Sequence, residues 1–596
     1  MAKKVKKKSN TYSCQQKLKW KLVIPLILLL SFLIYFNTLE TPFILDDNKL
    51  ITDNSAIQNG SVFTSFNLPR YVGYVSFGIN YKISKFNPIS YHIVNILIHC
   101  LNAMLIIILL AKLFSRVKER DLLQNYKYLP YFVALLFVVH PLQTQAVTYI
   151  VQRLTSLAAM FVLLSLILYI KFRESNKKYF LYCLSLFFVI LAYKTKENTA
   201  TLPLMIVATE AMFLREEVNV AVRKKVVWLI PFFILIILIP LSFIDLKTVN
   251  ISNIGDSLNK IESTMQNIFR EFRETTQETK LISRQEYLIT EFNVILTYIR
   301  MLFYPANQSL HHIYPLANSL FEIPTFFSFL LLILIIVIAI LLSREYIELL
   351  FGVIWFYIFL LVESSIIPIQ DVIFEHRVYL PSIGIFIVFI YGLFFLIGRI
   401  GFKVLVAIVI VALLILSILT YRRNLVWKDE ISIWKDVINK YPLNYIAHGS
   451  LGTAYGKINQ CDKAIDELKI SLDIYPKYAK ALNNLGTCYV RIGNIKEALE
   501  AYYRAIELDP NYIKAYYNLA SLYYINGDIK QALFYLLLAN EIDNSNAMVN
   551  GQLGSLYCQI GNYQKSMDYF KKALSIEPDN ATIRYNYNLC IAKRKE

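Results

Sequence analysis

Long apolar stretches constrain this chain more than any other feature. The 596 residues are 56% hydrophobic, and the apolar excess lies almost entirely before residue 421. A helix needs about 20 apolar residues to cross the hydrocarbon core of a bilayer, because lipid offers no hydrogen-bond partner to a free backbone amide. The sequence therefore predicts an all-α fold, with a polytopic membrane domain at 20–420 followed by a domain of ordinary soluble composition.

Eleven apolar runs are expected to span the membrane. They lie at 20–35, 91–113, 129–149, 155–171, 179–193, 199–214, 226–244, 323–343, 350–367, 378–398 and 402–420. A further segment, 287–304, carries Glu291 and Arg300. Because ionisable side chains are costly at membrane depth, this segment is predicted to be re-entrant or interfacial.

The basic residues predict the orientation of these helices. The formal charge of +18 comes from a lysine-rich N-terminal segment, 1–19, and from short loops between apolar runs. Positive charge in such places marks the cytoplasmic side, and it predicts no nucleic-acid partner. The long loops 36–90 and 245–322 then lie on the opposite side, outside the cell or in a lumen. The chain after Tyr421 is expected on that side as well.

Four positions recur every 34 residues near the C-terminal end. They are Pro442, Pro476, Pro510, Asn544 and Pro578; Gly452, Gly486, Ala520 and Gly554; Tyr455, Tyr489, Tyr523 and Tyr557; and Ala464, Ala498, Ala532 and Ser566. Small residues where paired helices touch, and a proline that ends the second helix, are typical of tetratricopeptide repeats (TPR). The predicted repeats are 445–478, 479–512, 513–546 and 547–580, with a linker and half-repeat at 421–444 and a capping helix at 581–596.

A polar row shares the 34-residue period on the first helix of each unit. It consists of Ser450, Asn484, Asn518, Gln552 and Asn586. Carboxamides can bind the backbone of an extended peptide without reading its side chains, so Asn484, Asn518, Gln552 and Asn586 are predicted to bind a protein acceptor or partner. The row resembles the asparagine ladder of the soluble O-linked N-acetylglucosamine transferase. The alternative is that asparagine is simply common at this repeat position.

The seven cysteines form no CxxC pair and no metal spacing. Four of them lie in the repeat domain, namely Cys461, Cys488, Cys558 and Cys590. We interpret these four as packed small residues, which leaves the redox compartment undecided.

Ionisable residues gather at the predicted outer ends of the apolar runs. They are Asp46, Asp47, His140, Arg153, Lys194, Lys196, Glu197, His311, His312, Glu363, Glu375, His376 and Arg377. Each of them alone is more often a helix cap, an interfacial anchor or a salt bridge than part of a site. Their shared placement at one membrane face predicts a functional site.

The motifs LDDN, HPLQTQAVTYIVQR, KTKEN, ILTYIRMLFYPANQSLHHIYP and FEHRVYLPSIG follow one another in this order. In that order they resemble the transmembrane and tetratricopeptide-repeat O-mannosyltransferases, including bacterial relatives with the C-type glycosyltransferase (GT-C) fold. Two departures stand out. Gln145 replaces an acid that relatives often have, and KTKE at 194–197 replaces the usual SKE. Gln145 therefore cannot act as a base.

The resemblance implies an inverting transfer of a sugar, with mannose as the first candidate, from a polyprenyl-phosphate donor to a Ser or Thr hydroxyl of a protein. A loop carboxylate, Asp46 or Asp47, would be the base, with Glu197 or Glu375 orienting other groups. The predicted ligands of the donor phosphate are Arg153, Lys196, Arg377, His140, His311 and His312. No cofactor is required. Paired acids can bind a divalent metal, but mannosyltransferases of this fold generally do not use one.

Two other functions remain open from the sequence. One is a membrane scaffold or assembly factor whose repeats recruit a partner while the membrane domain is inert. The other is a ligase or polymerase that moves a preassembled oligosaccharide. The expected membrane is a bacterial inner membrane with the repeats on the periplasmic side, and the alternative is the endoplasmic reticulum.

Overall fold

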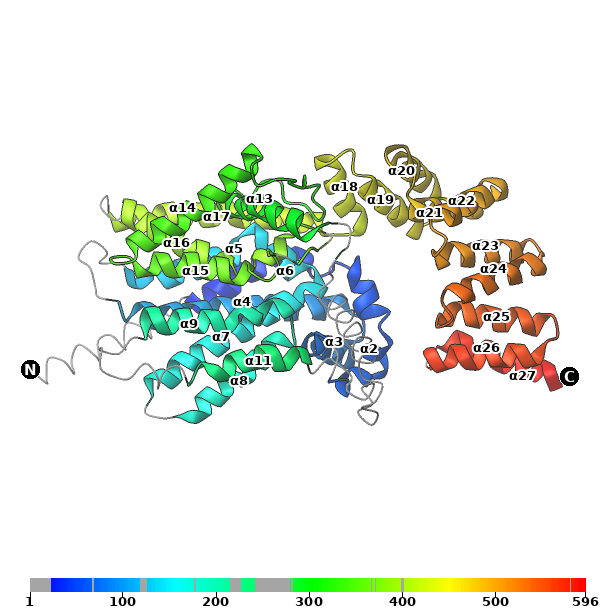
Figure 1. The fold of residues 1–596 in the computed structure, drawn as a ribbon, viewed down its shortest axis with the longest axis horizontal. Coiled ribbons are helices and arrows are strands. Elements are labelled where there is room, and N and C mark those ends of the chain that lie inside the picture. The colour runs from blue at the N-terminus through cyan, green and yellow to red at the C-terminus, as the bar shows by residue number, and fades with distance from the viewer. Residues whose placement is uncertain are drawn as a thin grey trace, which may run out of the picture. The chain divides into compact units, whose positions relative to one another are not determined.

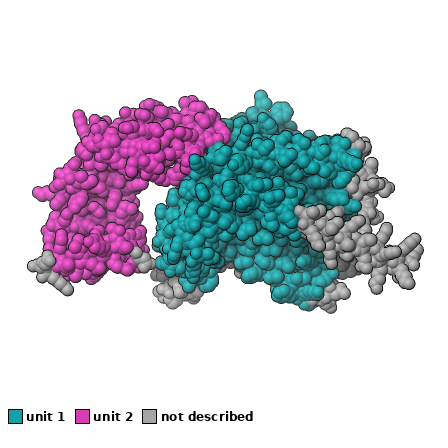
Figure 2. Space-filling view, turned by 180° about the vertical axis from the view of Figure 1, so that it is seen from behind, with its two compact units in different colours: residues 1–428 teal, residues 429–596 magenta. Residues whose placement is uncertain are grey.

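The chain forms two compact units, residues 1–428 and 429–596. The computed structural model describes residues 23–66, 69–117, 126–175, 178–214, 227–241, 279, 282–365, 367–369, 371–397, 401–578 and 580–595. Throughout these residues the chain is helical and forms no strand, which confirms the all-α class. Figure 1 shows the helices along the chain, and Figure 2 shows the two units in separate colours.

The first unit is a bundle of helices around one hydrophobic core, whose buried residues run from Ile27 to Val409. Its longer helices are Val23–Thr38, α3 (Tyr71–Ser84), α4 (Pro88–Phe114), α5 (Leu129–Val139), α7 (Arg153–Glu174), α8 (Tyr179–Tyr193), α9 (Leu202–Phe213), α11 (Ile230–Leu241), α13 (Arg284–Phe303), α14 (Ile323–Leu342), α15 (Ile347–Leu360), α16 (Ser382–Ile397) and α17 (Phe402–Val426). Most of them lie side by side in Figure 1. Exposed leucine, isoleucine and phenylalanine side chains on α14 and α17 are typical of helix faces in contact with lipid.

Every predicted apolar run contains a described helix, but the helices differ in length. Four are long and apolar enough to cross a membrane: Pro88–Phe114, Ile150–Glu174, Ile323–Leu342 and Phe402–Val426. A bent pair, Leu129–Val139 with Pro141–Thr148, would make a fifth. The other apolar helices among the described residues are shorter, so the count of eleven crossings stays a prediction. The segment predicted to be re-entrant or interfacial forms the regular helix α13, which is not among the candidate spans.

The apolar run 129–149 is broken at His140, where the axis bends by 58°. Pro141 follows, and the His140 ring accepts a hydrogen bond from the Leu142 backbone N–H, as a helix-capping residue does. The chain then continues through short turns, η6 (Pro141–Gln143), α6 (Thr144–Thr148) and η7 (Ile150–Gln152), before α7 begins at Arg153. A loop-like path is thus buried at the end of the bundle.

Close helix contacts in the first unit depend on glycine. Gly352 on α15 faces Gly384 on α16, and a Cβ atom on either residue would overlap the backbone of the other helix. The pair therefore lets the two helices approach at backbone distance, which is common where membrane helices pack.

The second unit is a series of antiparallel helix pairs. The helices are α18 (Glu430–Lys440), α19 (Tyr445–Lys457), α20 (Cys461–Ile474), α21 (Ala479–Arg491), α22 (Ile495–Leu508), α23 (Ile513–Ile525), α24 (Ile529–Ile542), α25 (Ala547–Gln559), α26 (Tyr563–Ile576) and α27 (Ala581–Lys595). Each predicted repeat contains one pair, and α27 follows the last pair at the place predicted for a capping helix. At Gly486 a Cβ atom would lie 2.8 Å from Cε1 of Tyr502, which explains the small residue at this position of the repeat.

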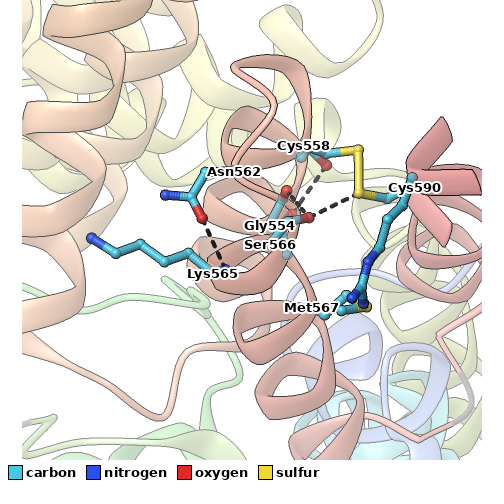
Figure 3. Close-up of a disulfide and its surroundings, with 10 residues drawn as sticks. Gly554, Cys558, Asn562, Lys565, Ser566, Met567 and Cys590 are labelled. Atoms are coloured by element: carbon cyan, nitrogen blue, oxygen red, sulfur yellow. Dashed lines mark hydrogen bonds between the residues drawn. A yellow bond between two sulfur atoms is a disulfide. The ribbon is translucent and has the colours of Figure 1, made fainter. Parts of the chain in front are cut away.

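The interpretation of the repeat-domain cysteines is wrong for two of the four. Cys558 on α25 and Cys590 on α27 form a disulfide with a Cα–Cα distance of 5.8 Å (Figure 3). Cys461 and Cys488 are buried and free, as the interpretation has it. The sequence could not reveal the bond, because its 32-residue separation becomes a contact only when α27 packs onto the last repeat.

Candidate functional site

The buried segment 140–155 connects the predicted site residues of the first unit. The Tyr149 hydroxyl accepts a hydrogen bond of 2.9 Å from the Asp46 backbone N–H. The Val151 backbone N–H donates to Oδ1 of Asp47 over 2.7 Å. Further along, Thr155 accepts from Nζ of Lys196 over 3.0 Å. Loops that are distant in the sequence therefore meet on this one segment.

The two aspartates of the LDDN motif lie in different environments. Asp46 is exposed. Asp47 is 1% exposed and accepts backbone hydrogen bonds at both oxygens, from Val151 and Ile44. Burial raises the pKa of Asp47 to about 8, while those two hydrogen bonds and Arg153 partly oppose the change. Asp47 therefore holds the loop in place through its two backbone hydrogen bonds. The Asp46 carboxylate remains accessible.

Arg153 is completely buried at the start of α7. Its guanidinium donates to Oδ1 of Asn95 over 2.7 Å, to Oδ1 of Asn80 over 2.6 Å, and to the carbonyl oxygens of Tyr91 and Ser76. These four acceptors occupy most of its donors. A donor phosphate would have to displace some of them to bind Arg153 directly.

Two ion pairs lie close to one another between the 194–198 turn and neighbouring loops. Nζ of Lys196 lies 3.1 Å from Oε1 of Glu363, and Nε of Arg70 lies 2.9 Å from Oε1 of Glu197. Glu363 is 7% exposed, and the charges of Lys196 and Arg377 both act on it. Glu363 is therefore a buried partner of Lys196, and Asn198 donates a further hydrogen bond to it over 3.2 Å.

Arg377 lies at the end of the same cluster, in η11 (Glu375–Val378). It is 3% exposed and donates to the carbonyl oxygens of Val372 and Asp371 over 2.8 and 2.7 Å. A longer contact of 3.5 Å joins its Nη1 to the Tyr287 hydroxyl. Its charge also acts on Glu363, so the EHR triplet and the Lys196 turn share one electrostatic environment.

Glu375 and the histidine pair form a second group. Oε1 of Glu375 accepts from the Ser309 backbone N–H over 2.6 Å and lies 3.5 Å from Nε2 of His312. Nε2 of His311 lies 3.6 Å from Oδ1 of Asp371. Burial opposes ionisation of Glu375, but the hydrogen bond with His312 and the charge of Arg423 hold its pKa below the usual value.

Two residues of the HPLQTQ motif have contacts that hold the backbone. Nε2 of His140 contacts the Leu302 carbonyl oxygen over 3.1 Å, and its Nδ1 caps η6. Oε1 of Gln145 accepts from the His376 backbone N–H over 2.8 Å. Gln145, which cannot act as a base, thus fixes the EHR triplet in position.

Several polar residues of the site carried no clear signal in the sequence. Arg70, the partner of Glu197, belongs to no motif of its long loop, and Tyr149 lies within an apolar run. Glu291 on α13 is 1% exposed and near Arg377. Its position in the largely apolar segment 287–304 was the one signal in the sequence.

The polar row of the repeats is half-buried along α19, α21, α23, α25 and α27. Nδ2 of Asn484 donates to Oγ1 of Thr453 over 2.7 Å, and Nδ2 of Asn518 donates to Oδ1 of Asn483 over 2.8 Å. Each of these bonds joins one repeat to the previous one. Part of the row's hydrogen-bonding capacity therefore links neighbouring repeats, and the remaining capacity is what a peptide would use.

The described residues include no group of three or more His, Cys, Asp or Glu side chains placed to hold a metal ion. The candidate site among them is thus composed of buried ion pairs, one accessible carboxylate and backbone-anchoring hydrogen bonds.

Comparison with known proteins supports both units. Tetratricopeptide-repeat models match residues 479–512, 501–534 and 549–580. The chain is 25% identical to a protein O-mannosyl-transferase of Caenorhabditis elegans over 462 residues, which cover 72% of this chain and 59% of that protein. It is 32% identical to protein O-mannosyl-transferase TMTC4 of Homo sapiens over 185 residues, 27% of this chain and 25% of the relative.

A further relative and one solved structure are also similar to parts of this chain. Protein O-mannosyl-transferase TMTC2 of Mus musculus is 32% identical over 158 residues, which cover 24% of this chain and 18% of the relative. Among solved structures, MamA is 29% identical and is covered to 89%, against 26% of this chain, with a TM-score of 0.23. The chain thus spans less than two thirds of the length of these curated relatives.

The fold and the repeats define the chain as an α-helical membrane protein with a TPR solenoid. Its resemblance to the transmembrane and tetratricopeptide-repeat O-mannosyltransferases, first seen in the motifs, is confirmed by similarity to several proteins of that name.

Proposed function

We propose that this protein is a glycosyltransferase that moves a sugar, mannose in the first instance, from a polyprenyl-phosphate donor to a Ser or Thr hydroxyl of a protein. The names of the relatives support a transferase acting on protein. The observation that carries the proposal is the meeting of the LDDN loop, the Lys196 turn and the EHR segment on the buried segment 140–155.

In this proposal Asp46 is the general base. An attacking hydroxyl must lose its proton as it bonds to the anomeric carbon, and a carboxylate within hydrogen-bond reach can accept that proton. Asp46 is exposed, whereas both oxygens of Asp47 are occupied by backbone N–H groups. Asp47 then keeps the loop rigid, so that the base meets the acceptor in one geometry.

Lys196 and Arg377 provide positive charge for the departing lipid phosphate. The phosphate gains negative charge as its bond to the sugar breaks, and fixed cations in a water-poor site stabilise that charge. Both side chains are at least nine-tenths buried and already lie beside carboxylates. Attack from the face opposite the phosphate inverts the anomeric centre, and no cofactor takes part.

The repeat unit is proposed to bind the protein acceptor on the external face of the membrane. The Cys558–Cys590 disulfide supports this location, because disulfides persist in the bacterial periplasm or the lumen of the endoplasmic reticulum and are rare in the cytosol. We favour a bacterial inner membrane, with the repeats in the periplasm.

The function is tested by transfer from polyprenyl-phosphate mannose to a protein acceptor in membranes that contain the full chain, with Asp46→Asn membranes as the control. We expect transfer by the wild type alone. Transfer of only preassembled oligosaccharide would favour the hypothesis of a ligase or polymerase. A wild type that is inactive with every lipid-linked donor would favour a scaffold.

The location is tested in a Cys14→Ser/Cys183→Ser background, with one cysteine introduced at the exposed Lys469. A membrane-impermeant thiol reagent should label it from outside the cell without lysis. Labelling that requires lysis would place the repeats in the cytosol.

A further inference from the structure

Glu291 is a buried carboxylate that the mechanism above does not use. It lies on α13 and is 1% exposed; Tyr287 and Ser364 lie near enough to act on its charge, but no donor among the described residues lies within hydrogen-bond distance of its oxygens. An ionised carboxylate without partners is costly in a protein interior. A group that donates hydrogen bonds to it would remove this cost.

The face of α13 that carries Glu291 is held against the proposed donor site. Tyr287 and Tyr298 lie four residues before and seven after Glu291, on the same face of the helix. The Tyr287 hydroxyl donates to the Glu363 carbonyl oxygen over 2.7 Å, and the Tyr298 hydroxyl donates to the Phe374 carbonyl oxygen over 3.0 Å. Glu291 is therefore positioned between two anchored tyrosines and faces the segment that carries Glu363 and Arg377.

Other polar atoms in this neighbourhood also have no hydrogen-bond partner among the described residues. They are Oγ of Ser364 and Nδ1 of His376. Ser364, His376 and Lys196 are each 8% exposed, whereas Glu291 is 1% exposed. Glu291 is thus the most deeply buried of these polar side chains.

The chemistry of these atoms selects the kind of ligand. Burial raises the pKa of Glu291 to about 7, while Arg377, Ser364 and Tyr287 oppose the increase. Because Glu363 also acts on the charge of Glu291, this position disfavours a negatively charged sugar such as a uronic acid. The Glu291 carboxylate accepts hydrogen bonds strongly from hydroxyl groups.

We propose that Glu291 and Ser364 form the subsite that binds the hydroxyl groups of an uncharged sugar on the lipid donor. This inference rests on the proposed function and specifies its substrate. The phosphate of the donor would lie towards Lys196 and Arg377, and the sugar ring towards α13. Glu291 would then recognise the sugar, and Asp46 would activate the acceptor.

The test measures equilibrium binding of two probes to the purified full-length protein, polyprenyl-phosphate mannose and polyprenyl phosphate without sugar. The wild type should bind the sugar-bearing lipid more tightly. In Glu291→Gln this preference should fall roughly tenfold, because hydrogen bonds to a charged acceptor are stronger than those to a neutral one. Binding of the sugar-free lipid should not change. Glu345→Gln, at an exposed glutamate, is the matched control.

Three other outcomes of the binding measurement would overturn the subsite. Equal loss of both probes in Glu291→Gln would mean a structural role, and an unchanged preference would mean no contact with the sugar. A wild type that binds both lipids equally would also overturn the subsite. If Glu291→Gln does not fold, Ser364→Ala gives the same readout with a smaller loss. Sugar-dependent binding without any transfer would instead refute the proposed function and leave the subsite intact.

Discussion

The membrane unit and the repeat unit bury polar residues in different ways. In the first unit Asp47, Arg153, Lys196, Glu291, Glu363, Glu375 and Arg377 are all at most 8% exposed. Among the described residues of the second unit, no aspartate, glutamate, lysine or arginine is buried. Its buried polar residues are neutral, such as Ser471, Asn483 and Asn550, apart from His448.

The buried residues of the two units therefore serve different purposes, stability in the repeats and chemistry in the membrane unit. Stacked repeats are stabilised by apolar contacts between neighbours, and charged residues remain at the surface. Buried charges add little net stability, because desolvation offsets the attraction between them. Their accumulation in the first unit fits the proposed transfer reaction, which would need fixed charge in a water-poor site.

The largest expected effect is at Asp46. Replacing it with asparagine removes the proton acceptor and keeps the size of the side chain, so transfer should fall by about 10²–10⁴-fold. Asp47→Asn should mainly destabilise the protein, because one of its two backbone hydrogen bonds is lost. Transfer rates and thermal unfolding of both variants in detergent separate the two roles. Full activity in Asp46→Asn would end the assignment of Asp46 as the base.

The next effect concerns ion pairs in the two units. Lys196→Met leaves Glu363 buried without its closest cation, which should cost about 3–5 kcal/mol of unfolding free energy. The Lys457–Glu430 pair of the repeat unit, where Lys457 is 54% exposed, should contribute at most about 1 kcal/mol. Denaturant unfolding of Lys196→Met and Lys457→Met measures the loss of unfolding free energy at each ion pair.

A double variant checks the cause. Adding Glu363→Gln to Lys196→Met should restore part of the lost stability, because the unpaired charge is then absent. Equal losses in the single and double variants would mean that packing, and not charge, explains the effect.

A somewhat smaller effect is expected at the disulfide. Closing a loop between residues 32 apart in the sequence should stabilise the end of the solenoid by about 3–4 kcal/mol. In Cys558→Ser/Cys590→Ser, α25 to α27 should be cleaved faster by protease, and wild type treated with reductant should behave in the same way. Cys183→Ser, at an exposed free cysteine, is the control. Identical cleavage of all variants would show that the bond adds no stability.

The smallest effect is expected along the polar row. Asn484→Ala, Asn518→Ala and Asn586→Ala should each weaken acceptor binding by about 0.5–1.5 kcal/mol, the net value of one hydrogen bond. The measurement is the acceptor concentration that gives half-maximal transfer in the single and triple variants. Two of these residues also bond to a neighbouring repeat, so thermal stability is recorded in parallel. Lower stability with unchanged acceptor use would make the row a purely structural feature.

The repeats were almost fully predictable from the sequence. Their contacts are local, so the 34-residue period of small residues, tyrosines and prolines is enough to place each helix pair. The disulfide was the exception, because Cys558 and Cys590 lie outside that period. In the membrane unit, the apolar runs predicted where helices lie, but they did not reveal the bend at His140.

The sequence by itself determined the helical class, the repeats and the set of ionisable residues at loop ends. Only the tertiary structure decided how those residues are paired: Lys196 with Glu363, Arg70 with Glu197, and Glu291 near Arg377. It also separated the exposed Asp46 from the buried Asp47, which are neighbours in the chain. The physical reason is that burial and charge pairing depend on segments far apart in sequence, whereas periodicity and hydropathy are local properties of the chain.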